Sequence, residues 1–415
     1  MNIYAIIILS TLFLDFVINL FANILNLKTF SEELPEEFED VCDANVYQKT
    51  QDYTRVKTIF GLFTSSLSLI VTLIFWFAGG FNFLDTTVRS LDLISILTGI
   101  IYIVILMLLR GLFALPFRIV NTFIIEEHFG FNKTTPAIFT TDLLKGLALG
   151  ALLGGPLLAG LLAFFQYTGA FAWLYCWIVT SLFSLFIQFI SPTWIMPIFN
   201  KFTPLEEGTL KESIMRYARS VNFSIADIFV IDGSRRSSKS NAFFTGFGKN
   251  KRVALFDTLV EKHNVPELVA ILAHEIGHYK KRHIIQSIVI NIFHTGVMFF
   301  LLSIFIGNEK LFQAFYMEHV SIYAGFIFFG MLYTPIEFVL SIFLNMLSRN
   351  NEFQADRFAS STIQNPETLV NTLKNLSIHN LSNLKPHAFY VFLNNSHPPV
   401  LKRIKAIRKI KVPAA

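Results

Sequence analysis

The sequence predicts a mainly α-helical, polytopic membrane protein with seven membrane-spanning helices and a smaller polar part that contains a short β-sheet. Three observations support this fold class. Of the 415 residues, 53% are hydrophobic, only 15% are charged where soluble domains have about 25%, and the apolar residues lie in long runs. The 46 phenylalanines exclude a disordered chain. Two cysteines, Cys42 and Cys176, are too few for a disulfide scaffold.

Seven apolar runs approach or exceed the roughly 20 residues that a helix needs to cross a bilayer. They are residues 3–27, 59–81, 93–117, 146–165, 171–190, 284–306 and 320–347. The first run has no basic segment before it and is too long for the apolar part of a signal peptide. We therefore expect it to be retained as a span.

The basic residues predict how these spans are oriented, because Lys and Arg stay on the cytoplasmic side during insertion. With seven spans, all of the 34 Lys and Arg residues except Arg89 and Lys310 fall on one face. The N-terminus should therefore be external and both large polar segments cytoplasmic. In this setting the net charge of +5 indicates membrane topology, and we expect no nucleic-acid partner.

Two segments have the composition of soluble protein, residues 191–283 and 349–415. In the first, residues 223–231 and 252–260 alternate in polarity and are rich in Val, Ile and Phe, so they predict strands on either side of a Gly- and Ser-rich stretch. Residues 266–282 follow a helical pattern. The predicted organisation is five spans with loops in 1–190, a polar segment in 191–283, spans six and seven in 284–348, and a second polar segment in 349–415.

The helical stretch contains the pattern H-E-x-x-H, at His274, Glu275 and His278. Histidines four residues apart on a helix share one face, where they can bind one zinc ion, and the adjacent glutamate can take a proton from the water that zinc activates. The other interpretation is a pair of surface histidines on an amphipathic helix. The pattern favours a zinc hydrolase.

A catalytic zinc ion usually has three protein ligands and one open position, so a third ligand is needed. Glu352 and Asp356, just after the last span, again share one helical face. Glu352 is the natural third ligand, and Asp356 would hydrogen-bond the free ring nitrogen of a zinc-bound histidine. Such an acidic pair is also common on solvated helices, so alone it would not indicate a metal site. Together with the histidine motif, it favours completion of the zinc site.

Several longer blocks lead to a family. The sequence resembles the CAAX prenyl proteases of type 1, which are integral-membrane zinc endoproteases that convert a-factor. The blocks that carry this resemblance, in chain order, are IIEEHFGFNKTTP, MPIFNKFTPLEEGTLKESI, SRRSSKSNAFFTGFGKNKRVALFDTL, LAHEIGHYKKRH, NEFQAD and SHPPVLKRI.

The resemblance implies seven helices around a hydrated chamber, capped by a gluzincin-like zinc metalloprotease domain with a small sheet. It implies one Zn²⁺ ion bound by His274, His278 and Glu352. Glu275 would be the general base, and Asp356 would lie behind the ligands.

The resemblance also assigns residues outside the zinc motif. His397, in SHPP, looks like the histidine that stabilises the oxyanion of the tetrahedral intermediate, although alone it would be read as a loop residue. Asn241, with Ala242 and Phe243, looks like the segment that holds the substrate backbone. Apart from the resemblance, the position of Arg403 shortly after SHPP makes it the candidate to brace the active site.

Two features near this segment bear on substrate binding. Members of the family usually read RSSHSNA, and Lys239 here replaces that histidine, which puts the substrate preference near the cleft in doubt. The predicted strand at 252–259 could offer a free edge to which substrate adds as a strand. It could equally be paired on both sides, and the resemblance favours the free edge.

Four charged residues, Asp15, Arg110, Lys145 and Glu337, lie within or at the ends of apolar runs. A charge in the bilayer costs several kcal/mol unless it meets a partner or water, so we expect these residues to line a polar interior or to form buried ion pairs. The basic segment 403–411 could contact anionic lipid head groups or form a solvated helix end.

The leading hypothesis is a zinc endopeptidase that cleaves prenylated C-a-a-X or similar membrane-proximal substrates. The alternatives are a protease that degrades misfolded or stalled membrane proteins and, from another class, a transporter with a structural zinc. Expected partners are a peptide or protein substrate, prenylated or not, and the lipid bilayer. The expected location is a bacterial inner membrane or the endoplasmic reticulum membrane, with the active site facing the cytoplasm. The sequence leaves the physiological substrate and the oligomeric state undetermined.

Overall fold

The computed structural model describes residues 2–31, 33–245 and 252–410. The end of the Gly- and Ser-rich stretch, from residue 246, and the last residue of the basic segment, Lys411, lie outside the described residues.

Seven helical segments of the described residues are long and apolar enough to cross a membrane, which confirms the predicted fold class. They consist of α1 (Ile3–Leu27), α2 (Ala44–Phe77), α4 (Ser95–Val120) with η2 (Asn121–Glu126), α5 (Pro136–Leu149) with η3 (Gly150–Gly154) and α6 (Gly155–Tyr167), η4 (Gly169–Phe171) with α7 (Ala172–Ile190), η5 (Ser191–Ile195) and α8 (Met196–Phe199), α12 (His283–Phe305), and α14 (Ile322–Thr362).

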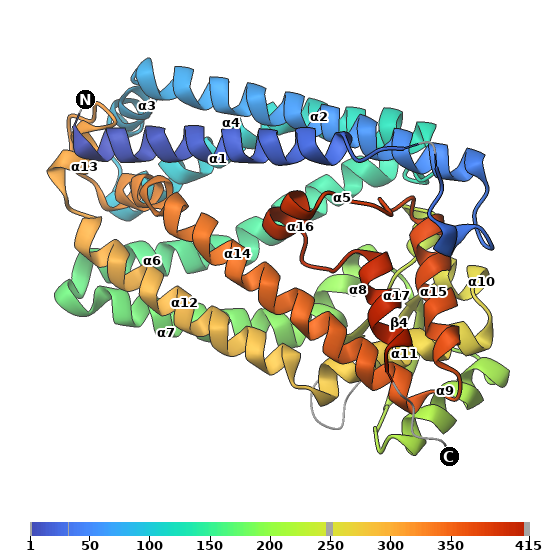
Figure 1. Cartoon of the computed structure of the whole chain (residues 1–415). Helices are drawn as coiled ribbons and strands as arrows, with labels where there is room; N and C mark the ends of the chain where they lie inside the picture. Colours follow the sequence, from blue (N-terminus) through green and yellow to red (C-terminus); the bar gives the residue numbers. More distant parts are fainter. Residues whose placement is uncertain (1, 32, 246–251, 411–415) are drawn as a thin grey trace.

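The long helices run roughly along one direction, and the polar part lies at one end of them (Figure 1). Helices α1 and α2 follow one edge, α7 and α12 follow the opposite edge, and α14 crosses the space between them. Short helices α3 (Gly80–Arg89) and α13 (Glu309–Gln313) lie at the other end, where Trp76, Phe315 and Phe328 are fully buried.

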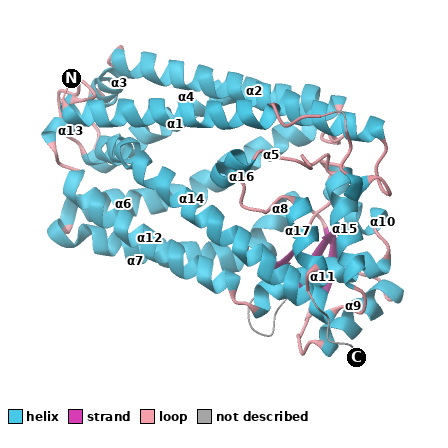
Figure 2. Ribbon diagram, viewed as in Figure 1, coloured by secondary structure: helices cyan, strands magenta, loops and turns pink. Residues whose placement is uncertain are grey.

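The polar part is a helical layer around a small sheet (Figure 2). Its elements are η1 (Glu36–Phe38), β1 (Phe202–Pro204), α9 (Thr209–Ser220), β2 (Asp227–Ile231), η6 (Gly233–Arg235), β3 (Ala242–Thr245), β4 (Arg252–Phe256), α10 (Asp257–Lys262), α11 (Val265–Lys280), α15 (Pro366–His379), α16 (Ala388–Asn394) and α17 (Val400–Arg408). One hydrophobic core joins the sheet to α9, α11, α15 and α17.

The sheet corrects three sequence-based expectations. The strand expected at 223–231 begins only at Asp227, because the N–H of Phe223 still donates to the carbonyl of Ala218 at the end of α9. The strand expected at 252–260 ends at Phe256, because Asp257 starts α10 and accepts hydrogen bonds from the backbone N–H and the hydroxyl of Ser234. The strand order is β1-β2-β4-β3, with β4 parallel to β2 and antiparallel to β3. The segment at 252–259 is therefore not a free edge, and the edge nearest the histidine motif in the sequence is β3.

Candidate active site

The histidine motif lies on α11, whose start is fixed by local sequence. The Asn264 side chain accepts from the backbone N–H of Glu267, the Glu267 carboxylate accepts in return from the Asn264 N–H, and Pro266 occupies the first turn. This capping box satisfies two backbone donors that would otherwise be unpaired. The helix then runs without interruption through His274 and His278, which point to one side.

Gly277 lets α11 approach α14 closely. A Cβ built at Gly277 would lie 3.0 Å from both the Cα and the carbonyl oxygen of Ala355, and 3.3 Å from the Cβ of Phe358. Only glycine fits this crossing without displacing the backbone of α14. One turn before Ala355 the same helix carries Glu352, so the close packing brings this carboxylate to the histidines.

His274, His278 and Glu352 form a compact triangle of potential ligand atoms, the one such group of three found among the described residues. The two Nε2 atoms are 3.2 Å apart, His274 Nε2 is 3.4 Å from Glu352 Oε2, and His278 Nε2 is 3.3 Å from Glu352 Oε1.

The triangle fits zinc. Tetrahedral ligands at the usual zinc distances of about 2.0–2.1 Å stand about 3.3 Å from one another. In addition, Oε2 of Glu352 is buried and makes no hydrogen bond; it has only the longer contacts with His274 Nε2 at 3.4 Å and Arg403 Nη1 at 3.3 Å, so it has a lone pair free for a metal ion. These side chains would hold the ion with one position left for substrate or water.

Asp356 and Arg403 support His274 from behind. Asp356 Oδ1 lies 2.9 Å from His274 Nδ1, and the Arg403 guanidinium donates to both Asp356 oxygens at 2.7 and 2.8 Å. Arg403 Nη1 also lies 3.3 Å from Glu352. Burial lowers the pKa of Arg403, but the carboxylates of Asp356 and Glu352 outweigh it and raise the pKa above its ordinary value. The arrangement fixes the ring orientation of His274 and the carboxylate of Glu352.

The structure adds a residue that the sequence-based reasoning missed. His283, the first residue of α12, places its Nδ1 3.0 Å from Nδ1 of His278, and its Nε2 is 3.5 Å from Gln354. His283 thus stands behind His278 as Asp356 stands behind His274. The available signal was weak, since three of the four residues between His278 and His283 are basic and suggest a surface segment.

Glu275 and His397 lie at the same centre. Burial raises the pKa of the Glu275 carboxyl, although the two neighbouring histidines act in the opposite direction. His397 comes from the loop before α17, is 68% exposed, and places Nδ1 3.1 Å from Glu352 Oε1. Glu275 thus follows His274 on α11, whereas His397 approaches from a separate segment of the chain.

The expected substrate-holding segment lies on the outer strand, β3. The carbonyl of Asn241 accepts from the N–H of Phe256, so by alternation the N–H and carbonyl of Ala242 face away from β4. The Asn241 side chain accepts from this Ala242 N–H at 2.9 Å. Phe243 is partly buried and lines a cavity beside α7 and α12.

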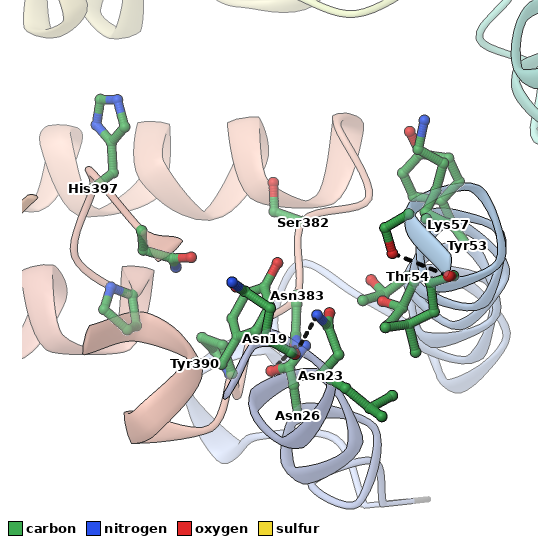
Figure 3. A pocket seen from close by; sticks show the side chains of 18 of the residues that line it. Asn19, Asn23, Asn26, Tyr53, Thr54, Lys57, Ser382, Asn383, Tyr390 and His397 are labelled. Carbon is green, nitrogen blue, oxygen red and sulfur yellow. Dashed lines mark hydrogen bonds between the residues drawn. The ribbon is translucent and has the colours of Figure 1, made fainter. Parts of the chain in front are cut away.

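A large cavity of about 1130 Å³ connects this centre with the membrane helices. Figure 3 shows His397 on one side of it, Tyr53 and Lys57 on α2 on the other, and the amides Asn19, Asn23 and Asn383 between them. The lining also includes Arg403 and many hydroxyl groups of α2. A polar cavity among membrane helices is a place for water and substrate.

The four charged residues of the apolar runs have different environments. Asp15 lines the large cavity and accepts from Asn19. Arg110 lines a separate cavity of about 800 Å³. Lys145 donates to the carbonyl of Ile198 at 2.7 Å, and Glu337 lies 3.1 Å from His294. Asp15 and Arg110 therefore line cavities as expected, whereas the contact of Glu337, whose side chain is 48% exposed, is not the buried ion pair foreseen from the sequence.

Comparison with known proteins gives consistent results. Residues 23–201 match the family described as CAAX prenyl protease N-terminal, five membrane helices, and residues 204–411 match peptidase family M48. The chain is 34% identical to CAAX prenyl protease 1 of Saccharomyces cerevisiae over 92% of this chain and 89% of that protein. It is 31% identical to the CAAX prenyl protease 1 homolog of Mus musculus, over 91% and 89%. The crystal structure of Ste24p from S. mikatae superposes with a TM-score of 0.93 at 32% identity, covering 98% of this chain and 99% of that one.

Proposed function

Since the chain belongs to peptidase family M48 and carries the N-terminal membrane region of the CAAX prenyl proteases, we propose that it cleaves prenylated C-a-a-X or similar membrane-proximal peptides. The family makes the chain a multi-pass membrane metallopeptidase with a metal that is generally zinc. The degradation of misfolded membrane proteins and the transport function are not favoured. The relatives that this chain matches over 89% of their length are named CAAX prenyl proteases.

The observation that carries the proposal is the triangle of His274, His278 and Glu352, with ligand atoms 3.2–3.4 Å apart. We propose that these three residues hold one zinc ion. When bound, zinc supplies a Lewis acid that lowers the pKa of water to about 7 and polarises a peptide carbonyl. Asp356, Arg403 and His283 would keep the ligand side chains in position, as their contacts suggest.

Glu275 is proposed as the general base. It is next to the first ligand on α11, and burial raises the pKa of its carboxyl, which favours proton transfer near neutral pH. After taking a proton from water, Glu275 would pass it to the leaving amine. His397 would donate a hydrogen bond to the oxyanion from the cavity side.

The substrate is proposed to add as a strand to the outer edge of β3. Ala242 offers an outward N–H and carbonyl for this pairing, with the Asn241 amide turning from the Ala242 N–H to the substrate. Phe243 would support the strand from behind. Strand addition holds the backbone of many sequences in one geometry, so specificity has to come from other contacts.

We further propose that the active site faces the cytoplasm, in an endoplasmic reticulum or bacterial inner membrane, as the distribution of Lys and Arg predicts. The division into segments 1–190, 191–283, 284–348 and 349–415 stays a prediction. Labelling of engineered cysteines at Lys28 and Lys310 from either side of sealed vesicles would test the orientation. The two sites should react from opposite sides.

The central test uses purified protein with a farnesylated C-a-a-X peptide and with an unfolded membrane protein. The Glu275→Gln variant should retain zinc near one equivalent and lose about 10²–10⁴-fold in kcat, since general base catalysis contributes that much. A chelator should abolish wild-type cleavage, and zinc should restore it. Cleavage of the unfolded protein alone would refute the C-a-a-X assignment, and full activity of the Glu275→Gln variant would refute the assigned base.

A further inference from the structure

The large cavity joins the candidate catalytic centre to a cluster of charges at the junction of α2 and the polar part. The cluster consists of Lys57, Tyr53, Glu126, Lys239 and Asn121, and two of its members, Tyr53 and Lys57, line the cavity together with His397 (Figure 3). The cavity therefore connects His397 with the cluster.

The contacts within the cluster leave it with excess positive charge. Lys57 lies 3.0 Å from Glu126 Oε1, and Lys239 lies 3.1 Å from Glu126 Oε2. Tyr53 donates to the same carboxylate at 2.8 Å and accepts from Lys239 at 2.6 Å. Within the described part of the chain, neither lysine is paired with a second carboxylate. The single negative charge of Glu126 is thus shared by the ammonium groups of Lys57 and Lys239.

Lys57 still has a donor to offer. Its ammonium carries three N–H groups, of which one reaches Asn121 Oδ1 at 2.5 Å and one reaches Glu126. The Lys57 side chain is 35% exposed, and it lines the cavity. In contrast, Lys239 also lies over the rings of Tyr53 and Phe131, so it mainly holds the cluster in place.

The edge of β3 defines where a substrate strand would stop. Two residues before Ala242, the amide of Asn380 accepts from the N–H of Ser240 at 3.2 Å and donates to its carbonyl at 3.4 Å. Asn380 thus occupies the outward groups of Ser240 as a neighbouring strand would. Backbone pairing of substrate should end near Asn241, and residues beyond that point need another anchor.

The distances along the chain suit a short C-terminal piece. Lys239 precedes Asn241 by two residues, which is about 7 Å of extended chain. A substrate whose C-terminal side points toward the cluster runs antiparallel to β3, the slightly more stable pairing. If its first residue after the cleaved bond lies beside Asn241, its third lies beside Lys239. The C-a-a-X motif has three residues after the cysteine and ends in a free carboxylate.

We propose that the Lys57 ammonium, held by Glu126 and Asn121, binds the free C-terminal carboxylate of the substrate. This inference rests on the proposed C-a-a-X peptidase function and adds a specificity determinant to it. The ion pair would make the site prefer peptides that end about three residues after the cleaved bond. It also gives Lys239 a role as the positioning residue of the subsite.

The experiment compares two farnesylated C-a-a-X peptides that differ only in ending as a free acid or as an amide. The wild-type kcat/KM should be at least about ten-fold higher for the acid, as expected for a charged hydrogen bond. The Lys57→Gln variant should lose about that factor on the acid, so that the acid-to-amide ratio falls toward one. Lys57→Arg should retain part of the preference.

Lys28→Gln is the matched control, because Lys28 is an exposed lysine at the end of α1 outside the cavity lining, and it should keep the wild-type ratio. In parallel, binding of both peptides to the Glu275→Gln variant is measured by fluorescence anisotropy. Loss of all cleavage would count against the proposed peptidase function, while the binding ratio would still decide on the subsite. Equal use or equal binding of acid and amide by the wild type would overturn the proposal. An equal loss of kcat/KM on both peptides in Lys57→Gln would also overturn it, since such a loss indicates that Lys57 only holds α2 against the polar part.

Discussion

The sharpest prediction concerns Gly277, which lies where the two helices of the proposed metal site cross closely. In a Gly277→Ala variant the new Cβ would lie 3.0 Å from the backbone of Ala355, whereas ordinary contact begins at 3.4 Å. The backbone of α14 must then move by about 0.4 Å or more. Protein metal sites tolerate deviations of only about 0.2 Å in ligand distance. We therefore expect zinc affinity to fall by about 10- to 100-fold, comparable to the loss of a supporting contact.

The assay is a zinc competition titration with a chromophoric chelator in detergent, combined with thermal unfolding of the zinc-free protein. Gly160→Ala is the matched control, because Gly160 lies inside α6 and a Cβ added there would have no atom within 4 Å. Helix propensity alone makes alanine about 1 kcal/mol better than glycine, so the control should be neutral or slightly stabilised. If Gly277→Ala binds zinc as tightly as the wild type, the close crossing does not position Glu352.

Two further predictions concern residues around the site and the anchoring of the polar part. His283→Ala should weaken zinc binding about ten-fold without unfolding the chain, since it removes the partner of His278, and the same titration measures it. Burial raises the pKa of Glu37, but hydrogen bonds from Lys374 and Arg408 outweigh this effect and hold the pKa below its ordinary value. These pairs therefore stabilise the fold above about pH 4.5, and their contribution is lost as the pH falls through the lowered pKa. Glu37→Gln should therefore lower the unfolding free energy by about 1.5 kcal/mol at pH 7, and the difference from the wild type should shrink at acidic pH in chemical denaturation; a pH-independent difference would contradict this assignment.

The membrane spans could be predicted because the signal is local. Each apolar run reports its own burial in lipid, and all seven runs recur in the helices. The extents were less accurate, since α2 and α14 continue into polar sequence. α14 runs to Thr362 because its last turns pack on α11 and bury Ala355 and Asp356. The end of such a helix depends on a partner far away in the sequence.

The strand order and the surroundings of the site could not be predicted for the same reason. Whether β4 is an edge strand depends on whether β3 pairs with it. The residues of β4 alone do not indicate that pairing. Lys239 stood out only as a departure from the family pattern. Its partners Tyr53 and Glu126 lie 186 and 113 positions away in the sequence, so these contacts could be identified only from the folded structure. The zinc motif, in contrast, is a spacing within one helix.

The proposed metal centre depends on the membrane bundle as much as on the polar part. α11 continues through Arg282, which has a left-handed backbone, directly into α12, and α14 brings Glu352 in from the membrane side. His283 on α12 supports His278, whereas Asp356 on α14 supports His274. Each histidine of the proposed ligand triangle thus contacts a residue of a different membrane helix.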